Sequence, residues 1–309
     1  MEELAVTIPH TRRVDFKSKV NGRYYSISIG LPFDPPPQNG YRVLYVLDGY
    51  AYFGSATEAV RINGNAPATV VVGIGYPDSP EFIESVLAHH GALTPHMAAL
   101  APIWAAVTLG RCFDLSLPAS DEVLAPMQMG LTSKDVGGLD NFLKTIETEV
   151  KPRVADIVAI DSSNQAIFGH SLGGLAVLHA LFTEPNAFRT FVAASPSIHW
   201  GRNAVLAGEE RFSAAVRDGA ARPRVLLTMG ADEDVVVPTS GADSKAVEEA
   251  RRQSRMVETA GDLSVRLQAL RGTSPYEVED YAVFPRQGHG ISPWPALGRA
   301  ISFAFPRAA

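Results

Sequence analysis

Short runs of apolar residues, separated by segments long enough for helices, constrain the fold of this chain more than any other feature. Residues 42–47 and 69–74 are apolar almost throughout, as in strands that are buried on both faces of a parallel sheet. Residues 50–62 lie between them and have room for a helix, so the segment predicts a βαβ unit. Similar strand candidates follow at 165–168, 191–194, 225–229 and 281–284, with helices expected at 172–182, 242–257 and 293–303. This alternation predicts an α/β fold with a mainly parallel central sheet and helices on both faces.

The beginning of the chain has a different pattern. Residues 14–20 and 23–31 alternate between polar and apolar side chains, with Asn21-Gly22 between them. An Asn-Gly pair between alternating runs is typical of a two-residue hairpin turn, in which both residues have positive φ. We therefore expect an antiparallel hairpin that adds an edge to the sheet.

One long segment does not fit the alternation. Residues 77–134 are rich in Pro, His and Met, and we expect them to form a cap or insertion over one end of the sheet. The remaining pattern contains no linker or internal repeat. With 309 residues, 46% of them hydrophobic, the chain is large enough for a substantial core, and we expect a single domain over 1–309.

Charge and cysteine content limit the class of function. The formal net charge is -6, which argues against a nucleic-acid partner. Neither a signal peptide nor an apolar run of about 18 residues is present, and we expect a cytoplasmic protein that does not bind membranes. The single cysteine, Cys112, excludes an intramolecular disulfide. We interpret Cys112 as a half-buried apolar residue in a strand or loop rather than as a nucleophile. The oligomeric state is left open.

The strongest chemical motif is Gly169-His170-Ser171-Leu172-Gly173. It follows an apolar strand candidate and precedes a helical run, which is the strand–turn–helix setting of a nucleophilic serine. The glycines allow the strand and the helix to approach closely, so that the hydroxyl projects from the turn. We predict Ser171 as nucleophile, and Leu172 N–H as the first oxyanion donor by its position after it.

Serine needs a general base and an acid, in the chain order Ser, acid, His for this type of fold. Of eight histidines, only His289 lies far enough downstream, just after the strand candidate 281–284, and it is flanked by glycines. The acid is expected after strand 225–229, where three carboxylates are adjacent. We rank Glu233 first, because it stands three residues after Gly230, then Asp232, then Asp234.

Several segments in order resemble a known family. Residues 41–49, 71–77, 169–174, 194–200 and 288–294 are similar to the putative-esterase family within the α/β hydrolases, and above all to trilactone esterases of enterobactin- and salmochelin-type siderophores. The resemblance extends over about residues 14–305. It implies the fold just described and the hydrolysis of an ester.

The resemblance also implies particular residues. Tyr50 N–H would be the second oxyanion donor, and Arg111, Trp200 and His170 are candidates for substrate contact. For Arg111 a structural salt bridge is the alternative, and for Trp200 a place in the core. The segment between Pro77 and Arg111 is longer than in siderophore esterases, which leaves the identity of the ester open.

That longer segment contains three histidines, His89, His90 and His96. We expect no metal site there, because no cysteine or carboxylate joins them at ligand spacing. No cofactor is expected elsewhere.

The sequence therefore predicts a serine hydrolase that cleaves a small-molecule carboxylic ester through an acyl-enzyme, with a siderophore-type lactone as the first candidate. The alternatives are a general carboxylesterase or acyl transferase with a remodelled cap, and a binding protein on a degraded hydrolase fold.

Overall fold

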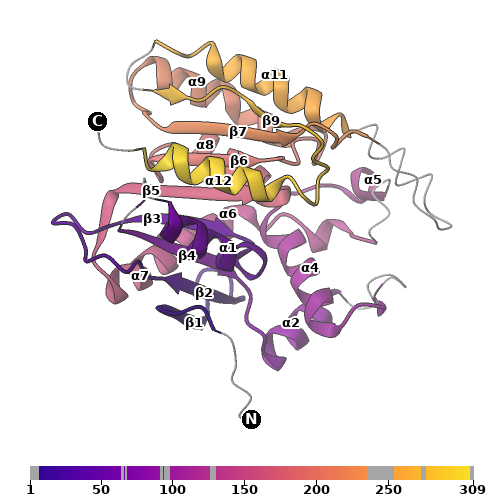
Figure 1. Cartoon of the computed structure of the whole chain (residues 1–309). Coiled ribbons are helices and arrows are strands. Elements are labelled where there is room, and N and C mark those ends of the chain that lie inside the picture. Colours follow the sequence, from indigo (N-terminus) through magenta and orange to yellow (C-terminus); the bar gives the residue numbers. More distant parts are fainter. Residues whose placement is uncertain are drawn as a thin grey trace.

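The computed structural model describes residues 7–63, 66, 68–90, 93, 98–125, 130–235, 254–272 and 276–306. In this part of the chain a nine-stranded sheet forms the centre of the molecule (Figure 1). Its order is β1-β2-β4-β3-β5-β6-β7-β8, and β9 also pairs with β7. The strands are β1 (Thr11–Lys17), β2 (Tyr24–Gly30), β3 (Tyr41–Leu47), β4 (Thr69–Gly75), β5 (Ile160–His170), β6 (Thr190–Ala194), β7 (Arg224–Gly230), β8 (Glu277–Val278) and β9 (Ala282–Phe284).

The sheet is parallel except at one edge. β4, β3, β5, β6 and β7 run parallel to one another, and β8 and β9 run parallel to β7. The hairpin β1–β2 is antiparallel, and β2 also pairs antiparallel with β4. Because the carboxyl ends of parallel strands meet at one edge, the loops that follow β3, β5, β6 and β7 lie close together there.

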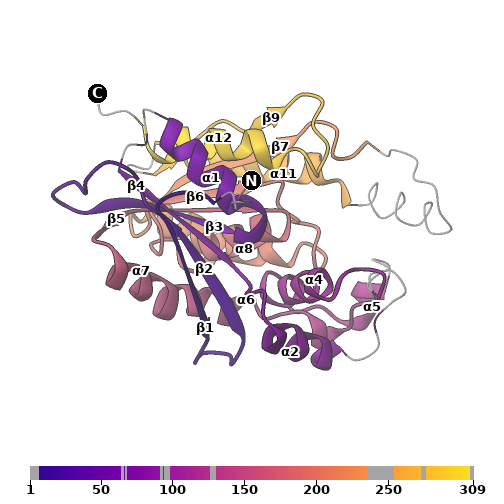
Figure 2. The same cartoon turned by 60° about the horizontal axis from the view of Figure 1, so that its bottom comes forward.

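Helices cover both faces of this sheet, as Figure 2 shows. In β3, Val43 and Tyr45 face one set of buried side chains and Leu44 and Val46 face another, so the strand is buried on both sides. α1 and α12 pack on the second set, while α6–α7, α8, α9 and α11 pack on the first. These helices are α1 (Gly49–Ile62), α6 (Leu139–Thr145), α7 (Lys151–Ile157), α8 (Leu172–Thr183), α9 (Glu209–Arg217), α11 (Met256–Gln268) and α12 (Pro293–Ala304), with the π-helix η3 (Ile146–Val150) joining α6 to α7 and the 3-10 helix η4 (Ala204–Gly208) preceding α9.

The segment 77–134 is mainly helical where it is described. It contains α2 (Pro80–His90), α4 (Pro102–Asp114), α5 (Asp121–Leu124) and the short η2 (Ser133–Asp135). Figure 2 shows α2, α4 and α5 together on one side of the sheet. The side chain of Arg111 in α4 contacts Asp48, directly after β3, so this segment lies at the carboxyl ends of the parallel strands. None of the helices in the described part of the chain has the length and apolarity to cross a membrane.

Three local predictions need correction or lie outside the described residues. The hairpin at the start is present, but Asn21-Gly22 does not form a two-residue turn with two positive φ angles. Only Gly22 has a positive φ, 72°, and its N–H donates to Ser18 O across a longer loop. The side chain of Asn21 closes this loop instead, since its Oδ1 accepts a hydrogen bond from Arg23 N.

Cys112 was predicted in a strand or loop, and this is wrong. It lies in the last turn of α4, is 1% exposed, and burial raises the pKa of its thiol to about 11 although the positive charge of Arg111 opposes the shift. Most of the helix predicted at 242–257 falls on residues outside the described part, where α11 begins only at Met256.

Candidate active site

Ser171 lies on the sharp turn between β5 and α8, where the backbone leaves the ordinary regions. Its φ is 61° and its ψ is -118°. Three backbone hydrogen bonds hold it there: Ser171 N donates to Ala194 O, and Ser171 O accepts from both Leu175 N and Ser197 N. A Cβ on Gly169 would lie 2.2 Å from Gly173 O, so only glycine permits this approach of strand and helix. Strain maintained by its surroundings is typical of functional sites.

The structure brings Ser171, His289 and Glu233 together from three loops. His289 Nε2 is 3.0 Å from Ser171 Oγ, and His289 Nδ1 is 2.6 Å from Glu233 Oε2. An ionised carboxylate only accepts hydrogen bonds, so the Nδ1 proton donates to Glu233 and Nε2 is left to accept the serine proton. This is the arrangement of a nucleophile, a general base and an orienting acid.

Glu233 is almost fully buried, at 3% exposure. Burial alone would raise the pKa of its carboxyl. The hydrogen bond and charge of His289, with hydrogen bonds from Ser195 and Gly230 N–H, outweigh burial and bring the pKa below its usual value. The carboxylate therefore stays ionised beside His289 at neutral pH.

The two lower-ranked acids point elsewhere. Asp232 is exposed to solvent. Asp234 accepts hydrogen bonds from Met256 N and Val257 N, at 2.9 and 3.1 Å, and so stabilises the start of α11. Neither one contacts His289 in any hydrogen bond of the described structure.

The predicted oxyanion donors belong to two helices that begin side by side. Leu172 is the first residue of α8, and Tyr50 is the second of α1. These helices follow β5 and β3, which are neighbours in the sheet. N–H groups in the first turn of a helix have no partner within it, and the helix dipole favours negative charge at this end. The assignment of both donors stays a prediction.

Arg111 faces an aspartate rather than an open pocket. Its Nε and Nη2 donate to the two carboxylate oxygens of Asp48, at 3.0 and 2.9 Å. Burial alone would lower the pKa of Arg111, but the charge and hydrogen bonds of Asp48 raise it. A Cβ on Gly173 would be 3.4 Å from Asp48 Oδ2, so the pair lies directly beside the turn that carries Ser171.

The other predicted substrate contacts also face protein groups. Trp200 is 3% exposed and donates from Nε1 to Leu117 O at 2.9 Å. His170 is 5% exposed, and its ring lies 4.6 Å from that of His289. As substrate contacts Arg111, Trp200 and His170 stay predictions, and their observed partners give them structural roles.

Exposed aromatic side chains lie around these residues. Trp104 of α4 contacts the Tyr50 ring edge-on, with centroids 5.7 Å apart, and Trp294 contacts Tyr52 in the same way at 5.5 Å. Trp104, Tyr50 and Trp294 are each more than 40% exposed. They provide apolar surface at the start of α1 and α12.

Several hydroxyl groups of the site were not predicted from the sequence. Ser197 Oγ is 3.3 Å from Ser171 Oγ, and Ser195 and Ser292 lie behind Glu233. Both Ser195 and Ser197 follow β6, in the segment 194–200 that carried part of the family resemblance, and this was the available signal.

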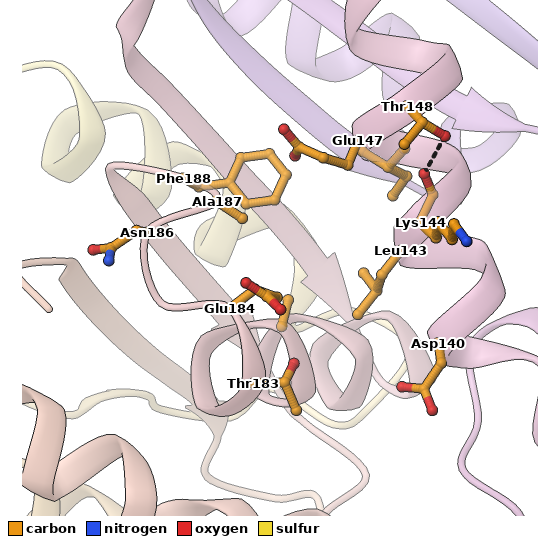
Figure 3. Close-up of a pocket in the computed structure, with 12 residues that line it drawn as sticks. Asp140, Leu143, Lys144, Glu147, Thr148, Thr183, Glu184, Asn186, Ala187 and Phe188 are labelled. Carbon is orange, nitrogen blue, oxygen red and sulfur yellow. Dashed lines mark hydrogen bonds between the residues drawn. The ribbon is translucent and has the colours of Figure 1, made fainter.

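The described residues contain no cluster of three or more side chains suited to a metal ion. His89 Nε2 contacts Lys134 O and His90 Nδ1 contacts Asp135, while His96 lies outside the described residues. A cavity of about 640 Å³ opens between α6, η3 and the end of α8 (Figure 3). Its lining includes Leu143, Phe188 and Glu184 but not Ser171, Glu233 or His289, so it is separate from this site.

The sequence of this chain is similar to those of known esterases. A protein-family model described as "Putative esterase" matches residues 117–265. The ferri-bacillibactin esterase BesA of Bacillus subtilis is 33% identical over 307 residues, which is 97% of this chain and 91% of that protein. The siderophore enterobactin esterase of Emericella nidulans is 32% identical, with 84% and 80% covered.

A solved structure has the same architecture. The BES protein from Bacillus cereus matches with a TM-score of 0.77 and 29% identity, over 99% of each chain. With the strand pairing described above, this match confirms the predicted α/β-hydrolase fold.

Proposed function

Because this chain belongs to the putative esterase family, we propose that it is a serine hydrolase that cleaves carboxylic esters, with siderophore-type lactones as its substrate class. One observation carries the serine mechanism: His289 lies 3.0 Å from Ser171 Oγ through one ring nitrogen and 2.6 Å from Glu233 through the other. The relatives support the substrate class, since they are named as esterases of siderophores.

In the first half of the reaction, Ser171 Oγ attacks the ester carbonyl carbon while its proton moves to His289 Nε2. The imidazolium that forms is stabilised by the Glu233 carboxylate, and the carbonyl oxygen becomes an anion. The N–H groups of Leu172 and Tyr50 are the proposed donors to that anion. Collapse of the intermediate breaks the bond to the alkoxide, which takes the proton from His289 and leaves as an alcohol.

In the second half, water replaces the alcohol. His289 removes a proton from water as the water oxygen attacks the acyl-serine carbonyl carbon. The second intermediate then collapses, the bond to Ser171 Oγ breaks, and His289 returns the proton to Ser171 Oγ as the carboxylic acid leaves. In a cyclic lactone one such cycle opens the ring, and later cycles shorten the linear chain. Every proton is moved by His289, so the chemistry needs no cofactor.

Labelling with a fluorophosphonate probe tests the mechanism. We expect the intact mass to increase by one adduct, mapped to Ser171, and Ser171→Ala to take up none. Ser171→Ala should lose about a millionfold in kcat with little change in unfolding temperature. Glu233→Gln keeps the shape of the acid but not its charge, and should lose about 10²- to 10⁴-fold. A Ser171→Ala enzyme with substantial activity, in a sample free of contaminants, would exclude the assignment.

A panel of esters tests the substrate class. We expect ferric trilactone siderophores to be hydrolysed with a larger kcat/KM than short p-nitrophenyl esters. The reverse order would indicate a general carboxylesterase. Transfer of the acyl group to an added alcohol in preference to water would indicate an acyl transferase.

A further inference from the structure

Four polar side chains form a line behind Glu233 that the mechanism above does not use. They come from four separate places: Tyr52 from α1, His170 from the end of β5, Ser195 from the residue after β6, and Ser292 from the residue before α12. Ser195 and Ser292 are 0% exposed and His170 is 5% exposed. Water does not compete for the hydrogen bonds among these three buried residues, so their polar groups must be satisfied by the protein, whereas Tyr52 at the end of the line is partly exposed.

The contacts are continuous. Ser195 Oγ is 2.5 Å from Glu233 Oε1, and Ser292 Oγ is 2.9 Å from Ser195 Oγ. His170 Nε2 is 3.4 Å from Ser292 Oγ, and Tyr52 Oη is 3.2 Å from His170 Nδ1. We refer to Tyr52, His170, Ser292 and Ser195 as the buried chain.

Counting protons fixes the direction of every bond in it. The Glu233 carboxylate has no proton to give, so the single hydroxyl proton of Ser195 lies on the bond to Oε1. Ser292 must then donate to Ser195, because two oxygens at 2.9 Å need a proton between them. The carbonyl oxygen of His289 is 3.2 Å from Ser292 Oγ, so it accepts the same proton only as the second acceptor of a bifurcated hydrogen bond.

With the Ser292 proton used, His170 must donate to Ser292 from Nε2. In a neutral imidazole that donates from Nε2, Nδ1 is bare and accepts the hydroxyl proton of Tyr52. All four donors of the buried chain therefore point toward Glu233, and His170 is held neutral as the Nε2–H tautomer. In agreement, burial and the neighbouring His289 lower the pKa of His170 to about 3, although Glu233 and Asp48 oppose the shift.

The backbone conformation of Ser195 and the position of Ser292 also indicate that their hydroxyls serve the buried chain. Ser195 has φ 43°, a left-handed conformation that serine adopts at a cost, and this conformation places it against Glu233. Ser292 stands at the N-cap of α12, yet its side chain makes no capping hydrogen bond there. The Ser195 hydroxyl is thus committed to the buried chain, and the Ser292 hydroxyl joins the buried chain instead of capping the first turn of α12.

We propose that the buried chain positions the catalytic acid: its directed hydrogen bonds, together with Gly230 N–H at 2.7 Å, hold Glu233 Oε1 so that Oε2 faces His289. This inference rests on the proposed function, in which Glu233 orients His289. Ser195, Ser292, His170 and Tyr52 are positioning residues, because they act on the reaction only through Glu233 and His289.

Substitutions along the buried chain give a graded result if it positions the acid. Ser195→Ala removes the direct donor and should lower kcat by about tenfold to a hundredfold. Ser292→Ala and Tyr52→Phe, further from Glu233, should have progressively smaller effects. KM should stay within about twofold in all three, since none of the deleted groups faces substrate in the proposed mechanism.

The matched control is Ser264→Ala. Ser264 is also a buried serine, 3% exposed, whose hydroxyl accepts a hydrogen bond from Gln268, but it lies in α11. We expect a similar loss of unfolding temperature in Ser264→Ala and Ser195→Ala, and a loss of kcat only in Ser195→Ala. Equal kcat values in these two variants would overturn the positioning role and leave the buried chain as a stabilising feature.

A second measurement does not depend on activity. In the wild-type protein labelled with ¹⁵N-histidine, His170 should show a protonated Nε2 and an unprotonated Nδ1 at pH 7. A proton on Nδ1 would overturn the directed chain even if the enzyme hydrolyses esters. If His170 has the expected Nε2–H tautomer but the protein does not hydrolyse esters, the directed hydrogen bonds of the buried chain are supported and the proposed function is rejected.

Discussion

At the scale of single residues, the contacts of Arg111 differ from what its neighbours in the sequence suggest. An arginine beside a candidate site is a natural partner for an anionic substrate, but here the guanidinium donates from Nε and Nη2 to both carboxylate oxygens of Asp48. The two residues are 63 positions apart. No local pattern links them, and only the packing of α4 against the end of β3 brings them together.

Removing Arg111 should therefore affect stability first. The side chain of Asp48 is only 4% exposed, and Arg111→Met would leave its charge unpaired. We expect a loss of about 3–5 kcal/mol in the free energy of unfolding, measured by urea denaturation. The double variant Asp48→Asn with Arg111→Met should recover part of this loss, because it removes the unpaired charge. Unchanged stability with a raised KM for anionic esters would show that Arg111 contacts substrate instead.

At the scale of elements, the sequence predicted best where one pattern determines one element. Continuous apolar runs predicted the central strands, and the motif around Ser171 predicted the start of α8. Residues 102–114 were not recognised as a helix, because the segment combines Pro102, Gly110 and a lone cysteine in a region read as an insertion. Its helical form depends on Ala105, Ala106 and Leu109 being buried against the rest of the molecule.

The predictability of the site follows the same rule. Ser171 and His289 stand in motifs of adjacent residues, and Glu233 has a fixed offset from the end of β7. Ser195 and Ser292 lie within the segments 194–200 and 288–294 that carried the family resemblance, but nothing in the sequence links them to Glu233, because their hydrogen bonds join separate elements and exist only in the folded chain. Residues that stand within one motif can therefore be predicted from the sequence. The hydrogen bonds proposed to position Glu233 depend on the tertiary structure and cannot.

The turn between β5 and α8 should tolerate no side chain at Gly169. In Gly169→Ala the new Cβ would meet the Gly173 carbonyl at 2.2 Å, and backbone cannot move aside as a flexible side chain does. We expect the free energy of unfolding to fall by at least about 1–3 kcal/mol, with a loss of kcat because Ser171 is displaced.

Gly298→Ala provides the matched control for that substitution. Gly298 lies exposed within α12, and a Cβ there would meet nothing within 4 Å. Since glycine weakens a helix interior, we expect Gly298→Ala to gain about 0.5–1 kcal/mol. Chemical denaturation of the two variants in parallel gives both values, and a loss of the same size in each would contradict the steric argument.

At the scale of the whole molecule, the site is assembled from loops at one edge of the sheet, and the buried chain behind it extends from Glu233 to Tyr52 in α1. His170 stands at the centre of this assembly beside His289, with Glu233 and Asp48 as negative charges nearby and Arg111 as a positive one. A buried imidazole that stays neutral connects the protonation of this region to the stability of the fold.

Stability should consequently fall as the pH is lowered. In the unfolded chain His170 takes up a proton below its ordinary pKa of 6.5, whereas in the folded protein its pKa is about 3. Between these values the unfolded state binds more protons, so acid favours unfolding. From pH 7 to 5 the wild type should lose about 2 kcal/mol more than His170→Gln, in urea denaturation at each pH. Parallel pH dependence of the two proteins would contradict this expectation.

The hairpin strand β1 has a consequence for the behaviour of the protein at high concentration. It is the last strand in the order of the described sheet, and its pairing there is with β2. Arg12, Arg13, Asp15 and Lys17 are all exposed along its seven residues. A second chain that paired with β1 would have to desolvate these charged side chains, which costs free energy. The charged side chains of β1 therefore disfavour fibril-like association of chains through this edge of the sheet. A fully apolar strand at the same edge would favour such association.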